Sequence, residues 1–84
     1  MVYYLIICRS LTSAQRTAAA LERAGITAHI RRSPRAIDQE GCSHSVKVSE
    51  RNLRNALLIL NRVGLPPKRV FLMKGEGSYE EVLL

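Results

Sequence analysis

The apolar positions of the chain recur with two different periods, and the change of period divides the sequence into strands and helices. Residues 2–8 form a continuous run of β-forming and large apolar residues, which is typical of a central strand covered on both faces. Residues 26–31 alternate between apolar and polar side chains, which indicates a strand with one buried and one solvated face. Residues 45–48 and 70–73 are shorter β-like runs, so the sequence predicts four strands.

Two helices are predicted between these strands from the 3.6-residue spacing of apolar side chains. In the first helix Thr12 is the expected N-cap, with Gln15 at capping-box spacing, and Gly25 ends the helix. The second helix is expected to begin after Ser49 and to end at Gly64, before two prolines that prevent its continuation. Both helices end in the pattern Leu-x-Arg-x-Gly-aliphatic, which is typical of a Schellman motif.

This order of elements predicts an α+β fold, a ferredoxin-like βαββαβ sandwich. Its four strands, numbered along the chain, would form an antiparallel sheet in the order 4-1-3-2, with both helices on one face. The single domain is expected to span residues 1–74. Residues 75–84 contain two glycines followed by a capping-like Ser-Tyr-Glu-Glu stretch, so they are expected to be flexible or to form a short helix.

The length and composition of the chain limit the kinds of site, compartment and partner that can be expected. A chain of 84 residues has room for one core, so any site lies on one surface or between copies. No apolar run reaches the ~20 residues of a membrane span, and the N-terminus lacks the basic start of a signal peptide. We therefore expect a cytoplasmic protein that does not contact a membrane. The net charge of +6 favours anionic partners, and no recognised catalytic or cofactor-binding motif occurs, so no cofactor is expected.

In the predicted topology, one edge of the sheet collects the residues best suited to chemistry. Four parts of the chain would meet at this edge: the end of the first strand and the following residues (8–10), the start of the first helix (Thr12 and Ser13), the loop 33–43 that contains Cys42, and the turn 66–69. Its cationic residues are Arg9, Arg31, Arg32, Arg35, Lys68 and Arg69. Nearby cations favour a thiolate, and Gly41 would leave the sulfur of Cys42 accessible. Cys42 is therefore the candidate catalytic residue, although Asp38 and Glu40 in its loop oppose thiolate formation. The candidate substrate- or anion-binding residues are Arg9, Ser10, Arg35, Gly41 and Ser43.

Alternative interpretations of the cysteines stay open. Cys42 could be an unreactive small residue at the first core position of the third strand, since free cysteine is commonly buried and inert. Cys8 is expected in the core, although a transient disulfide or persulfide relay with the loop cysteine would be within reach if the first and third strands pair. A metal site formed by Cys8, Cys42, His29 and His44 is disfavoured, because no Cys-x-x-Cys clamp occurs. No metal site is expected.

The opening residues 4–10 (Tyr-Leu-Ile-Ile-Cys-Arg-Ser) and the stretch 34–37 (Pro-Arg-Ala-Ile), followed by Gly41-Cys42, resemble a family of small bacterial proteins proposed to carry selenium or sulfur. The resemblance covers nearly the whole chain. It implies that Cys42 holds the sulfur or selenium atom and that Pro34 and Arg35 belong to the loop that presents it. Where the family pattern has a glycine directly after the cysteine, this chain has Ser43.

Three functions follow from these observations. The first is a sulfur or selenium carrier with a donor and an acceptor protein as partners. The second is a nucleic-acid-binding module, which is disfavoured because residues 43–48 offer no aromatic ring for base stacking. The third is a non-catalytic regulatory or interaction domain that works as a homo-oligomer. It would associate through the open face of the sheet, where Tyr4, Ile6, Phe71 or Met73 would form an apolar patch.

Overall fold

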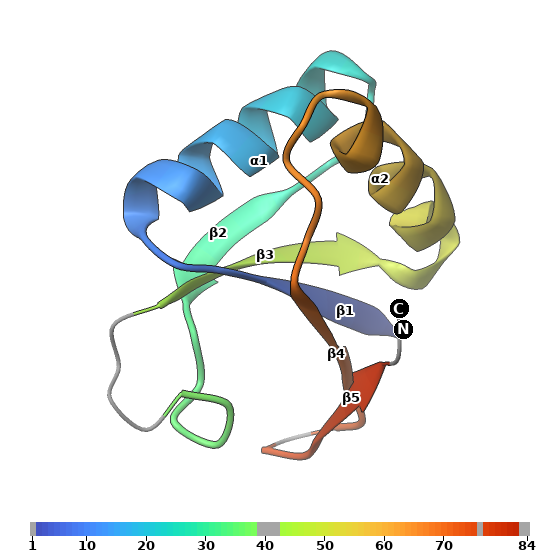
Figure 1. Cartoon of the computed structure of the whole chain (residues 1–84). Coiled ribbons are helices and arrows are strands. Elements are labelled where there is room, and N and C mark those ends of the chain that lie inside the picture. The colour runs from blue at the N-terminus through green and yellow to red at the C-terminus, as the bar shows by residue number, and fades with distance from the viewer. Residues whose placement is uncertain (1, 39–42, 76, 83–84) are drawn as a thin grey trace.

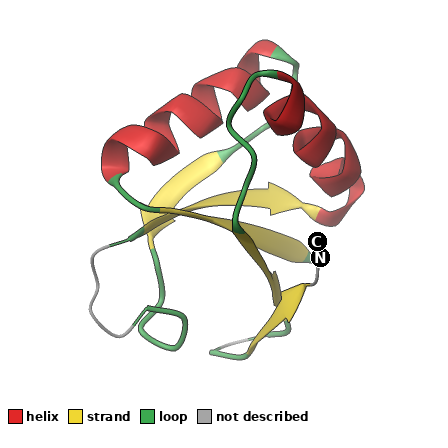
Figure 2. Cartoon of the chain, viewed as in Figure 1, coloured by secondary structure: helices red, strands yellow, loops and turns green. Residues whose placement is uncertain are grey.

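The computed structural model describes residues 2–38, 43–75 and 77–82, and these residues form a two-layer α+β fold. One layer is an antiparallel sheet of five strands, and the other consists of two helices that cover one face of that sheet (Figures 1 and 2). Along the chain the elements are β1 (Tyr3–Cys8), α1 (Leu11–Arg23), β2 (His29–Arg32), β3 (His44–Ser49), α2 (Glu50–Arg62), β4 (Arg69–Met73) and β5 (Tyr79–Val82). The strands lie in the order β2-β3-β1-β4-β5.

The α+β class with two helices agrees with the sequence, but the sheet has five strands and not the predicted four. A fifth strand, β5, pairs with β4 in the region for which the sequence predicted a flexible or short helical segment. Gly75 and Gly77 both adopt positive φ angles, 105° and 70°, which glycine tolerates without a steric cost. They reverse the chain between β4 and β5, and the N–H of Lys74 donates to the carbonyl of Ser78 across the turn at 2.8 Å. Pairing with β4 therefore determines the structure of a segment whose own pattern is too short to do so.

The main core lies between the helices and the sheet face that they cover. Its buried side chains include Ile6, Cys8, Ala14, Ala18, Leu21, Val46, Val48, Ala56, Leu60 and Val70. The predicted Schellman endings of both helices are confirmed. The N–H of Ile26 donates to the carbonyl of Leu21 at 2.9 Å, and the N–H of Leu65 donates to that of Leu60 at 2.8 Å. Both turns direct the chain from the end of a helix back toward the sheet.

The opposite face of the sheet differs from its prediction. Tyr4 and Ile6 belong to the core on the helix side, so their predicted place on the open face is wrong. The alternate residues of β1 lie on the open face, where Leu5 is 0% exposed and the neighbouring Phe71 on β4 is 8% exposed. The phase could not be obtained from the sequence because both alternate sets of β1 are apolar.

Cationic side chains cover aromatic rings on this open face. The Nζ atom of Lys47 lies 4.1 Å from the centroid of the Tyr3 ring, and Cζ of Arg69 lies 4.9 Å from that of Phe71. Such cation–π contacts bury ring surface within a single chain. These cations thus already cover part of the apolar patch through which a homo-oligomer was predicted to form. The homo-oligomer itself stays a prediction. No helix in the described part of the chain is both long and apolar enough to cross a membrane.

Candidate functional site

Two adjoining surface pockets lie at the C-terminal end of β1. The first, with a volume of about 320 Å³, is lined by α1 and by the turn 64–68, and we call it the helix-side pocket. The second, of about 220 Å³, is lined by residues 37, 38 and 43 and by the start of β4, and we call it the loop-side pocket. Residues 7–9 and Lys68 line both pockets. The end of β1 therefore connects two hollows built from distant parts of the sequence.

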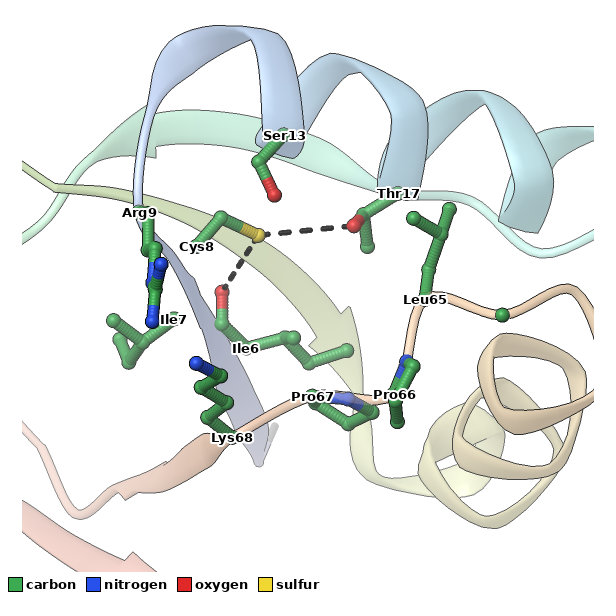
Figure 3. A pocket seen from close by; sticks show the side chains of 11 residues that line it. Ile6, Ile7, Cys8, Arg9, Ser13, Thr17, Leu65, Pro66, Pro67 and Lys68 are labelled. Atoms are coloured by element: carbon green, nitrogen blue, oxygen red, sulfur yellow. Dashed lines mark hydrogen bonds between the residues drawn. The ribbon is translucent and has the colours of Figure 1, made fainter.

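The thiol of Cys8 lies in the wall of the helix-side pocket. Figure 3 shows its sulfur directed toward α1, between the hydroxyl groups of Ser13 and Thr17. The thiol donates to Thr17 Oγ1 at 3.8 Å or to the carbonyl of Ile6 at 3.9 Å. Burial raises the pKa of Cys8, and hydrogen bonds from Thr17 and Ser13 oppose this shift only in part. Cys8 is 6% exposed and belongs to the core, as the sequence predicted.

The start of α1, next to this pocket, differs from its prediction. Ser10 is the N-cap, and its hydroxyl accepts a hydrogen bond from the N–H of Ser13 at 3.1 Å. The predicted cap at Thr12 is wrong, because Thr12 already lies inside the helix. Several residues between positions 10 and 13 are good N-caps, and the sequence alone does not choose among them. Ser10, a predicted anion-binding residue, thus uses its hydroxyl oxygen to cap the helix.

The loop-side pocket is bounded by the two described ends of the β2–β3 loop. The N–H of Ser43 donates to Asp38 Oδ2 at 2.8 Å, and the carbonyl of Ser43 accepts from the N–H of Ser33 at 3.2 Å. The N–H groups of Ile37 and Asp38 both donate to the carbonyl of Pro34 at 2.9 Å, which forms a compact turn. The hydroxyl oxygen of Ser43 is buried and has no hydrogen-bond partner in the structure as described. A buried hydroxyl without a partner is available to a bound group.

Cationic side chains surround both pockets, but they are not equivalent. Arg9 and Lys68 are exposed, and neither forms an ion pair with any residue of the described ranges. Arg69 lines the loop-side pocket, yet its guanidinium donates two hydrogen bonds of 3.2 Å to the carboxylate of Glu81. These bonds raise the pKa of Arg69 and lower that of Glu81. Arg9 and Lys68 are therefore the cations best able to meet an anion.

Of the other predicted residues, some lie away from both pockets and some lie outside the described residues. Arg35 is exposed on the turn that follows β2 and lines neither pocket. Arg31 and Arg32 lie on β2, the exposed edge strand. The predicted catalytic residue Cys42 and its neighbour Gly41 lie outside the described residues. The residues that the structure brings together from the prediction are thus Arg9 and Ser43, which both line the loop-side pocket.

Of the two hydroxyl residues that contact the Cys8 thiol, sequence reasoning placed Ser13 at this edge but did not single out Thr17. Ser13 and Thr17 are four positions apart, so they lie on one face of α1 above the end of β1. This i, i+4 spacing is visible in the sequence and is the signal that could have identified Thr17. Among the described residues, no group of three or more histidine, cysteine, aspartate or glutamate side chains could hold a metal ion.

The arrangement as a whole suits the binding of an anion at the end of β1. Two exposed cations stand between two pockets, and a buried hydroxyl and a buried thiol lie in the pocket walls. Comparison with known proteins finds a match, over residues 3–72, to the family described as "Putative Se/S carrier protein-like". Neither the curated proteins nor the solved structures give a match. Because the family match covers most of the chain, the protein belongs to this family of Se/S carrier protein-like chains.

Proposed function

We propose that the protein carries sulfane sulfur or selenium on Cys42 and passes it from a donor protein to an acceptor protein. The position of Ser43 supports this proposal independently of the family description. Ser43, the residue that directly follows Cys42 in the sequence, lines the loop-side pocket together with Arg9 and Lys68. Cys42 is therefore the sequence neighbour of a residue that shares a pocket with two cations that form no ion pair within the described ranges, and cations close to a thiol favour its thiolate.

The transfer of sulfur to Cys42 would need no external oxidant or reductant. The thiolate of Cys42 attacks the outer sulfur of a persulfide on the donor protein. A new S–S bond forms at Cys42 while the S–S bond of the donor breaks, and the donor leaves as a thiolate. Both the attacking thiolate and the resulting persulfide anion carry negative charge. Positive charge from Arg9 and Lys68 would stabilise them throughout the reaction.

The described side chains of the loop-side pocket have separate roles in this proposal. Asp38 accepts the hydrogen bond from the N–H of Ser43 and so holds the two ends of the loop together. Its carboxylate also lies near Arg69, whose pKa it helps to raise. The hydroxyl of Ser43 lacks a partner among the residues described and could donate to a sulfur anion. Arg9 and Lys68 supply the positive charge.

The proposal also covers the setting in which the protein works. A reducing cytoplasm would keep both cysteines as thiols between transfers. The transfer itself requires one chain and its partners, and a homo-oligomer is not needed for it. We further propose that the fold is a ferredoxin-like sandwich to which β5 adds an edge strand.

Mass spectrometry of the intact protein after incubation with a persulfide-forming cysteine desulfurase and cysteine tests the proposal. We expect a gain of about 32 Da, the mass of one sulfur atom, which a reductant removes. Cys42→Ser should abolish this gain, whereas Cys8→Ala should retain it because the Cys8 thiol is buried. Arg9→Gln should slow the modification, and Arg54→Gln, which removes an exposed charge on α2, is the matched control. An unmodified wild-type protein, or modification that survives in Cys42→Ser, would overturn the proposal.

A further inference from the structure

The helix-side pocket combines an apolar wall with a cationic rim. Figure 3 shows Leu65 and Pro66 on one side of it and Arg9 and Lys68 on the other. Ile6 and Pro67 add apolar surface, and none of the residues that line this pocket is acidic. Its volume of about 320 Å³ is within the range of sites that bind small organic molecules. The shape and the lining therefore suit a small ligand with one charged end.

Polar groups on the third side of the pocket add directional contacts. The side chains of Ser13 and Thr17 line it from the first turns of α1. The first turn of α1 contains no acidic side chain, so the partial positive charge at this end of the helix is not neutralised locally. Hydroxyl donors, an uncompensated helix end and two cations all favour negative charge on a bound molecule.

We propose that the helix-side pocket binds a small organic carboxylate. The apolar body of the ligand lies against Leu65 and Pro66, and its carboxylate faces Arg9 and Lys68. The two cations of the rim can both bind one carboxylate group, and the apolar wall can contact the uncharged remainder of the ligand. This site lies beyond the proposed sulfur transfer, since it does not depend on Cys42.

Titration of isotope-labelled protein with 3-phenylpropionate, followed by NMR, tests this assignment. We expect saturable shifts of the amide signals of residues 8, 13, 17 and 65. The uncharged 3-phenylpropionamide should bind at least threefold more weakly, because it lacks the charge that the rim recognises. Arg9→Gln and Lys68→Gln should each weaken binding of the carboxylate about twofold to fivefold, as for the loss of one exposed ion pair. Arg54→Gln, a matched loss of charge on α2, should leave the affinity unchanged.

A second variant tests the cavity independently of charge. Ser13→Leu places an apolar side chain in the helix-side pocket, and the backbone N–H of residue 13 can still donate to Ser10, so α1 keeps its cap. With the fold verified by circular dichroism, this variant should lose binding of 3-phenylpropionate. Unchanged binding in folded Ser13→Leu would overturn the assignment, as would equal affinity for the amide. Cys42→Ser should bind the probe like the wild type, so failure of this test is distinguishable from failure of the sulfur transfer.

Discussion

The N-cap of α1 allows a sharp test of how this region is built, because α2 supplies a matched control. Ser10 is the N-cap of α1, two residues after the end of β1, and Ser49 is the N-cap of α2 and the last residue of β3. The hydroxyl of Ser10 accepts a hydrogen bond from the N–H of Ser13 at 3.1 Å, whereas the side chain of Ser49 makes no capping hydrogen bond. Replacement of each serine by alanine therefore removes the same atoms but only one hydrogen bond.

The structure sets the size of the expected difference. Loss of an N-cap hydrogen bond costs about 1 kcal/mol of unfolding free energy, so Ser10→Ala should lose this amount. In a domain of this size, such a loss lowers Tm by about 4–8 °C. Ser49→Ala should lower the unfolding free energy by less than Ser10→Ala does, because the half-buried side chain of Ser49 makes no capping hydrogen bond. Ser10→Asp keeps an acceptor and adds a negative charge to a helix start that has none, so it should match or exceed wild-type stability.

Urea denaturation followed by circular dichroism measures these differences, with thermal melting as a second readout. The m-values of the wild type and of the three variants should agree, since none of the substitutions alters the surface exposed on unfolding. Equal losses in Ser10→Ala and Ser49→Ala would refute the reasoning, because the observed hydrogen bond would then have no measurable effect. A Ser10→Asp variant less stable than Ser10→Ala would refute the argument from the helix dipole.

Two further predictions rest on the pKa shifts. In a Cys42→Ser background, Cys8 should react with iodoacetamide far more slowly in the native protein than in urea. The free energy of unfolding of the same variant should fall as the pH rises above 9.0, the ordinary pKa of the thiol. The sign follows because the folded protein keeps the proton that the unfolded chain loses first. Glu81 has a lowered pKa, so its contribution to pairing of β5 should be lost as pH falls below its ordinary value of 4.5. Amide hydrogen exchange of β5 should report that loss, and Glu81→Gln should show a smaller increase in exchange between pH 6 and pH 3 than the wild type, because the ion pair of Lys74 with Glu80 remains. A wild type without these pH dependences would contradict both predictions.

The features predicted well from the sequence are those determined by local chemistry. Gly25 and Gly64 each follow the last turn of a helix and precede an aliphatic residue, and the structure shows positive φ at both. Only this local arrangement is needed for a Schellman ending, so the pattern was sufficient. The two helices and the α+β class follow in the same way, from the spacing of apolar residues within single segments.

The features predicted wrongly depend on contacts between segments. Residues 79–82 carry two glutamates and no long apolar run, and their strand forms because β4 offers an edge to pair with. Ile6 faces the helices, whereas Leu5 lies on the opposite face of the sheet. Because β1 is apolar on both sides, packing against the helices determines this orientation, and the sequence pattern does not. The bond between Arg69 and Glu81 depends in turn on β5. Arg69, one of the cations predicted at this edge of the sheet, is therefore already paired.

The two proposals share Arg9 and Lys68, so variants of these residues cannot separate them. Ser13 lines only the helix-side pocket, and Ser43 lines only the loop-side pocket. If both proposals hold, Ser13→Leu should block the carboxylate probe without preventing persulfide formation, and Ser43→Ala should slow persulfide formation without weakening the probe. Arg9→Gln should impair both processes. Any variant that impairs both while touching only one pocket would instead indicate a single continuous site across the end of β1.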